Sequence, residues 1–224
     1  MMSDHHDQDQ HSTPSAIASP GNDAVWIQKR RLAAAMRKVI ELLVTTEAPE
    51  DELRVAADRL ERYAQRLEAQ PRQYITWGHP EASTAGSTGS FFDLSPFMGL
   101  ANPLAPPIML WVDGDTVRGK AKFGWAYQGP PDHLHGGFVA ALFDETLGLA
   151  QSMTGNPGMT GTLTVRYRKP TPLYTSLRIE ATVRRVEGRK IFTEARLYAG
   201  DVLTADAEAI FISLNLKALK ESTA

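Results

Sequence analysis

The chain has no cysteine among its 224 residues. Disulfide bonds and thiolate metal sites are therefore excluded, and a reducing compartment is compatible with the sequence. The chain also lacks an excess of charge of either sign, because 24 Lys and Arg stand against 26 Asp and Glu, so it offers no general basic surface for nucleic acid. No apolar run approaches the roughly 20 residues that span a bilayer, and the N-terminus lacks the basic start and apolar core of a signal peptide. We expect a soluble cytoplasmic protein without a membrane span.

Residues 1–23 differ in composition from the rest of the chain. They contain four Asp and neither Lys nor Arg. A segment this polar cannot bury enough apolar surface to offset its ordering entropy, so we predict a disordered tail. Its histidines His5, His6 and His11 could bind a metal ion adventitiously, but a solvated tail is the simpler interpretation.

Two helices are expected between residues 24 and 72. Apolar residues recur at helical spacing from Val25 to about Thr45, and again from Pro49 to about Gln70. Pro49 suits the first turn of a helix, and the acidic residues 50–52 suit its positive end. We interpret the pair as a helical hairpin that docks on the main domain or on a neighbouring subunit. A pair of helices that binds another protein is the alternative.

Residues 73–107 connect this hairpin to the rest of the chain. They are rich in Gly, Ser and Pro, and no regular structure is evident. A connection this long is usually functional or disordered. Its second part, from Phe91 to Pro107, is too apolar to be solvated, so we expect it to line a pocket or an interface.

Residues 108–217 carry the pattern of an α+β domain. Strands are predicted at 108–112, 116–126, 159–168, 176–186, 189–199 and 202–214, and an apolar helix at 136–153. In the fourth of these strands apolar and polar residues alternate, which is typical of a sheet with one buried face. The order is two strands, a buried helix and a four-strand meander. An antiparallel sheet of about six strands wrapped round one central helix is the hotdog fold.

Gly136 and Gly137 open the predicted central helix. A helix start presents unpaired N–H groups and a partial positive charge, and glycine lets a ligand come close to them. Such a site suits a carbonyl oxygen on which negative charge develops. Asp144 lies on the same helix among apolar residues, where a carboxylate is costly unless it is paired or used in chemistry. Glu145 is turned about 100° away round the helix, and we expect it to be exposed or to support Asp144 from outside.

The spacing of the two groups adds a constraint. Eight residues separate Gly136 from Asp144, which places their backbones about 12 Å apart along a helix. One carbonyl group cannot contact both. If both act, Gly136 of one subunit meets Asp144 of another, and the site requires a dimer or a larger assembly of dimers.

Several motifs in order carry a family resemblance. HGGFVAALFDETLG, the preceding YQGPPDHL and the following TGTLTVRYRKPTPL and VEGRK resemble the PaaI-type hotdog acyl-CoA thioesterases, in particular the branch with the human mitochondrial thioesterase superfamily members. The resemblance extends from about Asn102 to Leu214. It implies that Asp144 is the catalytic carboxylate, that the Gly136 amide holds the thioester oxygen, that His135 shapes the turn, and that Thr160 holds the carboxylate or the attacking water.

Coenzyme A carries phosphates, which call for basic side chains. In the resembling enzymes the positions of Arg166, Arg168 and Arg189 contact this part of the substrate, and Lys190 and Gly137 are added as substrate-binding candidates. Ordinary charges on the wet face of a sheet are the alternative. His133 and His135 have the spacing of a metal pair, but no third ligand is near in the sequence. We therefore expect neither a metal nor a cofactor.

The sequence favours hydrolysis of an acyl-CoA thioester, with a fatty or aromatic acyl group suggested by the apolar segment 91–107. A non-catalytic acyl-CoA or lipid-binding hotdog protein is the alternative. A hotdog dehydratase is disfavoured, because Asp144 occupies the thioesterase position. The sequence leaves open whether the carboxylate attacks directly or activates water, whether the assembly is a dimer or a tetramer, and what the N-terminal helices do.

Overall fold

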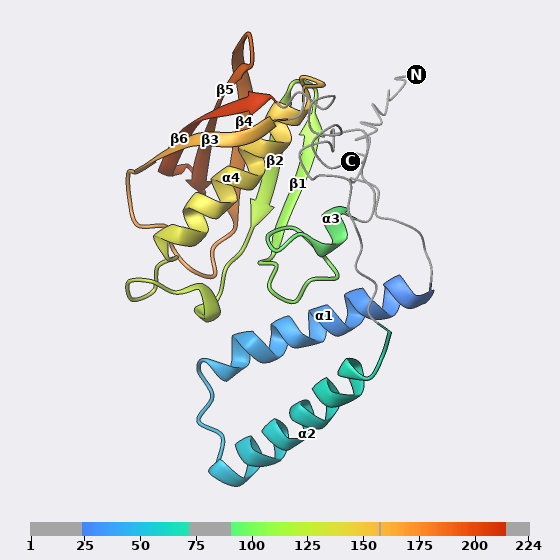
Figure 1. The fold of residues 1–224 in the computed structure, drawn as a ribbon. Coiled ribbons are helices and arrows are strands. Elements are labelled where there is room, and N and C mark those ends of the chain that lie inside the picture. Colours follow the sequence, from blue (N-terminus) through green and yellow to red (C-terminus); the bar gives the residue numbers. More distant parts are fainter. Residues whose placement is uncertain (1–23, 72–90, 157, 214–224) are drawn as a thin grey trace, which may run out of the picture.

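The computed structural model describes residues 24–71, 91–156 and 158–213 (Figure 1). The predicted tail, residues 72–90 of the connecting segment and the chain after residue 213 lie outside the described residues. The helices and strands are, in chain order, α1 (Ala24–Leu43), α2 (Glu50–Glu68), α3 (Phe91–Leu94), β1 (Ile108–Asp113), β2 (Thr116–Ala121), the 3-10 helix η2 (Trp125–Tyr127), α4 (Gly136–Ser152), β3 (Gly158–Tyr167), β4 (Leu177–Glu187), β5 (Lys190–Ala199) and β6 (Val202–Ser213).

The six strands form one antiparallel sheet in the order β1-β2-β4-β5-β6-β3, and α4 lies across one face of it (Figure 1). The predicted hotdog fold is confirmed. Two details were wrong. The strand expected over 116–126 ends at Ala121, and β3 does not begin a four-strand meander. It pairs with β6 at the far edge of the sheet, because the connection from β3 to β4 crosses the end of the sheet instead of turning back in a tight hairpin.

The core lies between α4 and the sheet. Leu142, Phe143 and Leu147 on α4 are fully buried, and they face an apolar surface supplied by the inner side chains of the strands: Val117, Ile179, Ile191, Leu197 and Phe211. Burial of side chains of this size contributes about 1.5–3 kcal/mol each. The alternation seen in the sequence of β4 thus places one row of side chains on the helix and the other in solvent.

The opposite side of α4 is not covered in the same way. Gly137 is exposed, and Ala141, Asp144 and Gly148 are half-buried, so one side of the helix consists of small residues around a single carboxylate. The spacing of these residues, four, three and four, places them in one row. This side of α4 is therefore only partly covered within one chain, unlike the side that packs on the sheet.

The hairpin docks on the domain through polar contacts of α1. Arg30 donates to the buried Asp93 carboxylate, and Arg37 donates to the backbone carbonyls of Leu100 and Asn102. The segment from residue 91 to residue 107 therefore lies between α1 and the sheet, where Ala105 is buried. Of the two expected docking sites, the main domain and a neighbouring subunit, α1 thus contacts the first.

The tight contact between α4 and the sheet gives a prediction for stability. Leu147→Ala removes a fully buried side chain and should lower the free energy of unfolding by about 2–5 kcal/mol. Leu104→Ala is the matched control, because Leu104 is 69% exposed, and it should change the stability by no more than about 0.5 kcal/mol. Urea unfolding followed by circular dichroism measures both. Equal effects of the two variants would contradict the central position of Leu147.

Candidate functional site

The start of α4 is held by His135. The His135 Nδ1 atom accepts a hydrogen bond of 3.0 Å from the N–H of Gly137, which makes His135 the N-cap of the helix. The N–H of Gly136 makes no hydrogen bond within the described part of the chain. The two glycines are thus not equivalent: the amide of Gly137 already has a partner, and the amide of Gly136 is the free donor at the positive end of the helix.

The loop before α4 is fixed from two sides. The N–H of His135 donates to the carbonyl of Tyr127 over 2.9 Å, which ties the helix start to η2. The Glu41 carboxylate on α1 in turn accepts from the backbone N–H groups of Trp125, at 2.8 Å, and Ala126, at 3.1 Å, and from the hydroxyl of Tyr174. Glu41 therefore caps η2 from a helix that lies more than 80 residues earlier. This contact could not be predicted from the sequence, since Glu41 belongs to no local motif.

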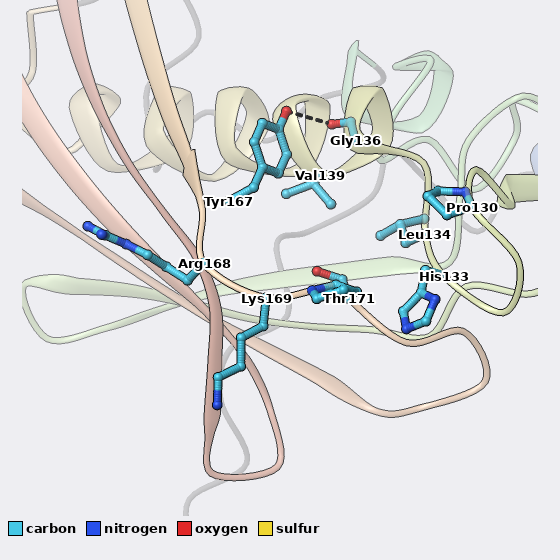
Figure 2. A pocket seen from close by; sticks show the side chains of 10 residues that line it. Pro130, His133, Leu134, Gly136, Val139, Tyr167, Arg168, Lys169 and Thr171 are labelled. Atoms are coloured by element: carbon cyan, nitrogen blue, oxygen red, sulfur yellow. Dashed lines mark hydrogen bonds between the residues drawn. The ribbon is translucent and has the colours of Figure 1, made fainter.

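A cavity of about 360 Å³ opens beside the start of α4 (Figure 2). Its wall is largely apolar, with a basic side at residues 168 and 169, and it is lined by Pro130, His133, Leu134, Gly136, Val139, Tyr167, Arg168, Lys169, Pro170 and Thr171. The Tyr167 hydroxyl donates to the carbonyl of Gly136 over 3.0 Å (Figure 2). Tyr167 and Lys169 were missed as candidates from sequence, because both read as exposed residues at the end of a strand.

Asp144 and Thr160 lie together as the resemblance implied. The Thr160 hydroxyl donates to Asp144 Oδ1 over 2.9 Å. The hydrogen bond fixes one carboxylate oxygen and leaves the other available. Thr160 precedes a bulge, because it pairs with Phe211 while Thr162 pairs with Ile210, so that Gly161 is the extra residue. Without the bulge Thr160 and Tyr167, seven residues apart, would point to opposite faces of the sheet; with it both face α4.

Gly136 and Asp144 belong to the same continuous helix, so their backbones are about 12 Å apart. The Gly136 amide, the cavity and Tyr167 gather at one end of α4, while Asp144 and Thr160 gather on its half-exposed side. One chain therefore presents two groups of candidate residues that do not meet within it.

Glu145 was expected to be exposed or to support Asp144 from outside, and the first of these expectations was wrong. It is half-buried and not exposed. Burial, and to a lesser degree the neighbouring Asp144 carboxylate, raise the pKa of Glu145 from 4.5 to about 7. The carboxyl group next to Asp144 is therefore partly protonated near neutral pH.

The arginines that were expected to bind the phosphates of CoA already have hydrogen-bond partners within the chain. Arg166 donates to Asp206 and Glu208, and Arg168 donates to Asp206. These ion pairs raise the pKa values of both guanidinium groups and lower the pKa of the Asp206 carboxyl. Arg189 Nε donates to the carbonyl of Ser213. All three arginines are exposed, and a phosphate that binds Arg166 or Arg168 competes with carboxylates of the chain.

His133 and His135 do not form a metal pair here. His135 uses Nδ1 as the cap of α4, and His133 Nδ1 lies 2.6 Å from the carbonyl oxygen of Pro131. Within the residues that the structure describes, no group of three or more His, Asp or Glu side chains is arranged to hold a metal ion. No helix in the same ranges is long and apolar enough to cross a membrane.

The raised pKa of Glu145 makes stability depend on pH. A carboxyl whose pKa is higher in the folded state contributes stability that is complete below about pH 4.5 and is lost as pH rises through about 7. Glu145→Gln should remove this loss, so the variant gains stability relative to the natural chain between about pH 5 and about pH 8. Asp144→Asn should lower the pKa of Glu145 in an NMR titration, and burial should still hold it above 4.5. A Glu145 that titrates near 4.5 in the natural chain would contradict the assignment.

Comparisons with known proteins agree with the hotdog fold. Residues 132–205 match the family model of the thioesterase superfamily. The chain is 38% identical over 89 residues to the acyl-coenzyme A thioesterase THEM4 of Xenopus laevis, covering 39% of this chain and 40% of that protein. It is 35% identical over 127 residues to THEM4 of Bos taurus, covering 56% and 52%. The chain thus spans about half the length of the curated relatives that it matches, or less.

One solved structure matches nearly the whole chain. The crystal structure of a thioesterase superfamily protein is 31% identical, with a TM-score of 0.77, and the match covers 90% of this chain and 98% of that one. A match of 90% of the chain includes the N-terminal helices as well as the hotdog domain. With a relative of this identity covered almost completely, the chain belongs to the thioesterase superfamily.

Proposed function

We propose that this protein hydrolyses acyl-CoA thioesters, with Asp144 as nucleophile or general base. The observation that carries the proposal is the Asp144 carboxylate held by Thr160 on the half-exposed side of α4. The free N–H of Gly136 beside a largely apolar cavity supports it. Several of the relatives are named acyl-coenzyme A thioesterases.

In the reaction the thioester carbonyl oxygen accepts a hydrogen bond from the Gly136 amide, at the positive end of α4. As a general base, Asp144 takes a proton from water while the water oxygen forms a bond to the carbonyl carbon. The carbon–sulfur bond then breaks, the proton passes to the leaving thiolate, and the products are the free acid and CoA. Direct attack by the carboxylate would give an acyl-enzyme anhydride that water then hydrolyses. Thr160 orients the carboxylate on either route.

The two halves of the site have to come from two chains. Gly137, Ala141 and Gly148 surround Asp144 on α4 and leave room for a second helix to approach closely. β3 lies beside them at the edge of the sheet and carries Thr160. A dimer with antiparallel α4 helices places Gly136 of each chain near Asp144 of the other, and the two-fold axis gives two equivalent sites.

The substrate would enter at the cavity beside Gly136. Its apolar wall suits the pantetheine arm or the acyl chain, and Lys169 with Arg168 gives the rim a positive charge for phosphate. Arg166, Arg189 and Lys190 stay candidates for this role, and Gly137 for close approach of the substrate. His135 acts through the position of the helix start.

Asp144→Asn keeps the shape of the side chain and removes its negative charge. It should lower kcat at least about a hundredfold, because general acid–base groups contribute factors of about 10²–10⁴. Thiol release from acetyl-, phenylacetyl-, octanoyl- and palmitoyl-CoA measures the rate, and the absence of cysteine removes the protein's own background. Asp201→Asn, at an exposed hairpin turn, is the control.

Near-normal turnover in Asp144→Asn would exclude the mechanism. If none of the four substrates is cleaved by the natural chain while acyl-CoA binds, the protein acts as an acyl-CoA-binding hotdog protein. Comparison of the rates on the four substrates also identifies which acyl groups the protein accepts. A preference for octanoyl- or phenylacetyl-CoA over acetyl-CoA is the expected outcome.

Glu41 should act as a positioning residue for the same reaction. Glu41→Ala leaves the N–H groups of Trp125 and Ala126 without their acceptor, which loosens η2 and the helix start that it holds. We expect kcat to fall about tenfold with little change in KM, since a misplaced donor weakens transition-state binding. Glu41→Gln retains one acceptor oxygen and should recover part of the rate.

The control for Glu41 is Glu47→Ala, because Glu47 is an exposed carboxylate in the connection between α1 and α2. Hydrogen exchange at His135 and Gly137, whose N–H groups are hydrogen-bonded, supplies a readout independent of turnover and should become faster only in the Glu41 variants. Unchanged kcat and unchanged exchange in Glu41→Ala would show that α1 has no part in the site.

A further inference from the structure

α2 carries an apolar row that nothing in the described part of the chain buries. Leu53, Ala57, Leu60, Ala64 and Leu67 recur every four and three residues and share one side of the helix. None of the residues of α2 is buried, and the three leucines are 39%, 53% and 47% exposed. A helix of this kind gains little stability until its apolar side is covered.

The neighbouring helix does not cover this row. α1 contacts the domain through Arg30, Arg37 and Glu41, so its own apolar residues point elsewhere. α1 and α2 do not pack closely along their length, and α2 is the helix farthest from the sheet (Figure 1). Ten large apolar side chains of the two helices remain exposed: Val25, Ile27, Met36, Val39, Ile40, Leu42, Leu43, Leu53, Leu60 and Leu67. Apolar patches of this extent on soluble proteins mark interaction surfaces.

We propose that the occupant of this surface is the hairpin of a second copy of the chain, with the two α2 helices antiparallel. The Leu–Ala–Leu–Ala–Leu order reads the same in both directions, so a two-fold axis near Leu60 sets Leu53 opposite Leu67 of the second copy. The alanines opposite each other allow the helix backbones to approach closely. The apolar residues of α1 extend the contact on each side.

The charges beside the row fit this antiparallel arrangement. Glu52 and Arg66 lie on one flank of the row, and Arg54 and Glu68 lie on the other. Pairing about Leu60 brings Glu52 of each copy to Arg66 of the other, and Arg54 of each copy to Glu68 of the other. In parallel pairing the two flanks would face each other, which brings Glu52 to Arg54 and Arg66 to Glu68, so the exchange of Glu52 and Arg66 described below distinguishes the two directions. Glu61 on one flank and Arg59 on the other meet their own copies near the axis, so four favourable flank pairs stand against these two like-charged ones.

The proposal is independent of the hydrolase reaction and of any contact through α4. Whatever the hotdog domains do, loss of the α2 contact halves the mass of the assembly. A dimer becomes a monomer if the domains do not pair, and a tetramer becomes a dimer if they do.

The first test is Leu60→Asp, measured by sedimentation and light scattering on the full chain at micromolar concentration. We expect half the mass of the natural chain, with the circular dichroism spectrum of a folded protein. An unchanged mass would overturn the proposal. So would a natural chain that is already monomeric, because the apolar surface would then be covered by something other than a second copy.

A charge exchange tests the antiparallel register. Glu52→Arg and Arg66→Glu should each weaken self-association at least tenfold, and the double variant should restore it, because the pair re-forms with reversed signs. The two residues are fourteen positions apart on the helix, so the rescue cannot arise within one chain. Asp51→Arg and Arg62→Glu make the same charge changes on the opposite side of α2 and should have little effect. A double variant as weak as the single ones would overturn the register.

Discussion

The free N–H of Gly136 is the group on which the rest of the site depends. It is free because His135 takes the next amide, and its direction is set because the same His135 is tied by its own N–H to η2. The central helix, the loop before it and α1 together fix the direction of one hydrogen-bond donor. In a helix packed on a sheet, the first turn is the only part that can offer such a donor, since all later N–H groups are used within the helix.

The same geometry is the reason for the proposed assembly through α4. A carboxylate and a helix start on one rigid helix cannot converge on a single carbonyl group. The chain meets this constraint by leaving one side of α4 lined with small residues and by placing β3 at the sheet edge next to it. The N-terminal hairpin presents a second, separate surface, with its apolar residues turned away from the domain. The two surfaces have different character, since one is built round a carboxylate and the other round leucine.

Much of the fold could be predicted because its signals are local. The apolar helix, the alternation in β4 and the glycine turns fix the elements to within a few residues. The position of β3 beside β6 could not be predicted, because strand order depends on contacts between distant segments. In the site, Asp144 and Thr160 were found through a motif, and their hydrogen bond agrees with it. Three features could not be predicted from the sequence: the contact of Glu41, the position of Tyr167 and the burial of Glu145. Each depends on a neighbour far away in the chain or on the depth of the packing around it.

The bulge at Gly161 has a consequence for how this site can change over time. β3 is hydrogen-bonded to α4 at two points, through Thr160 near one end and through Tyr167 at the other. The extra residue of the bulge keeps these two side chains on the same face of the sheet. Deleting any one residue between them would turn one of the two outward. A deletion of two residues would preserve the faces but shorten the span by about 7 Å. The number of residues between Thr160 and Tyr167 is thus as constrained as the identity of these two residues. Natural variation in this strand should therefore occur by substitution and not by insertion or deletion.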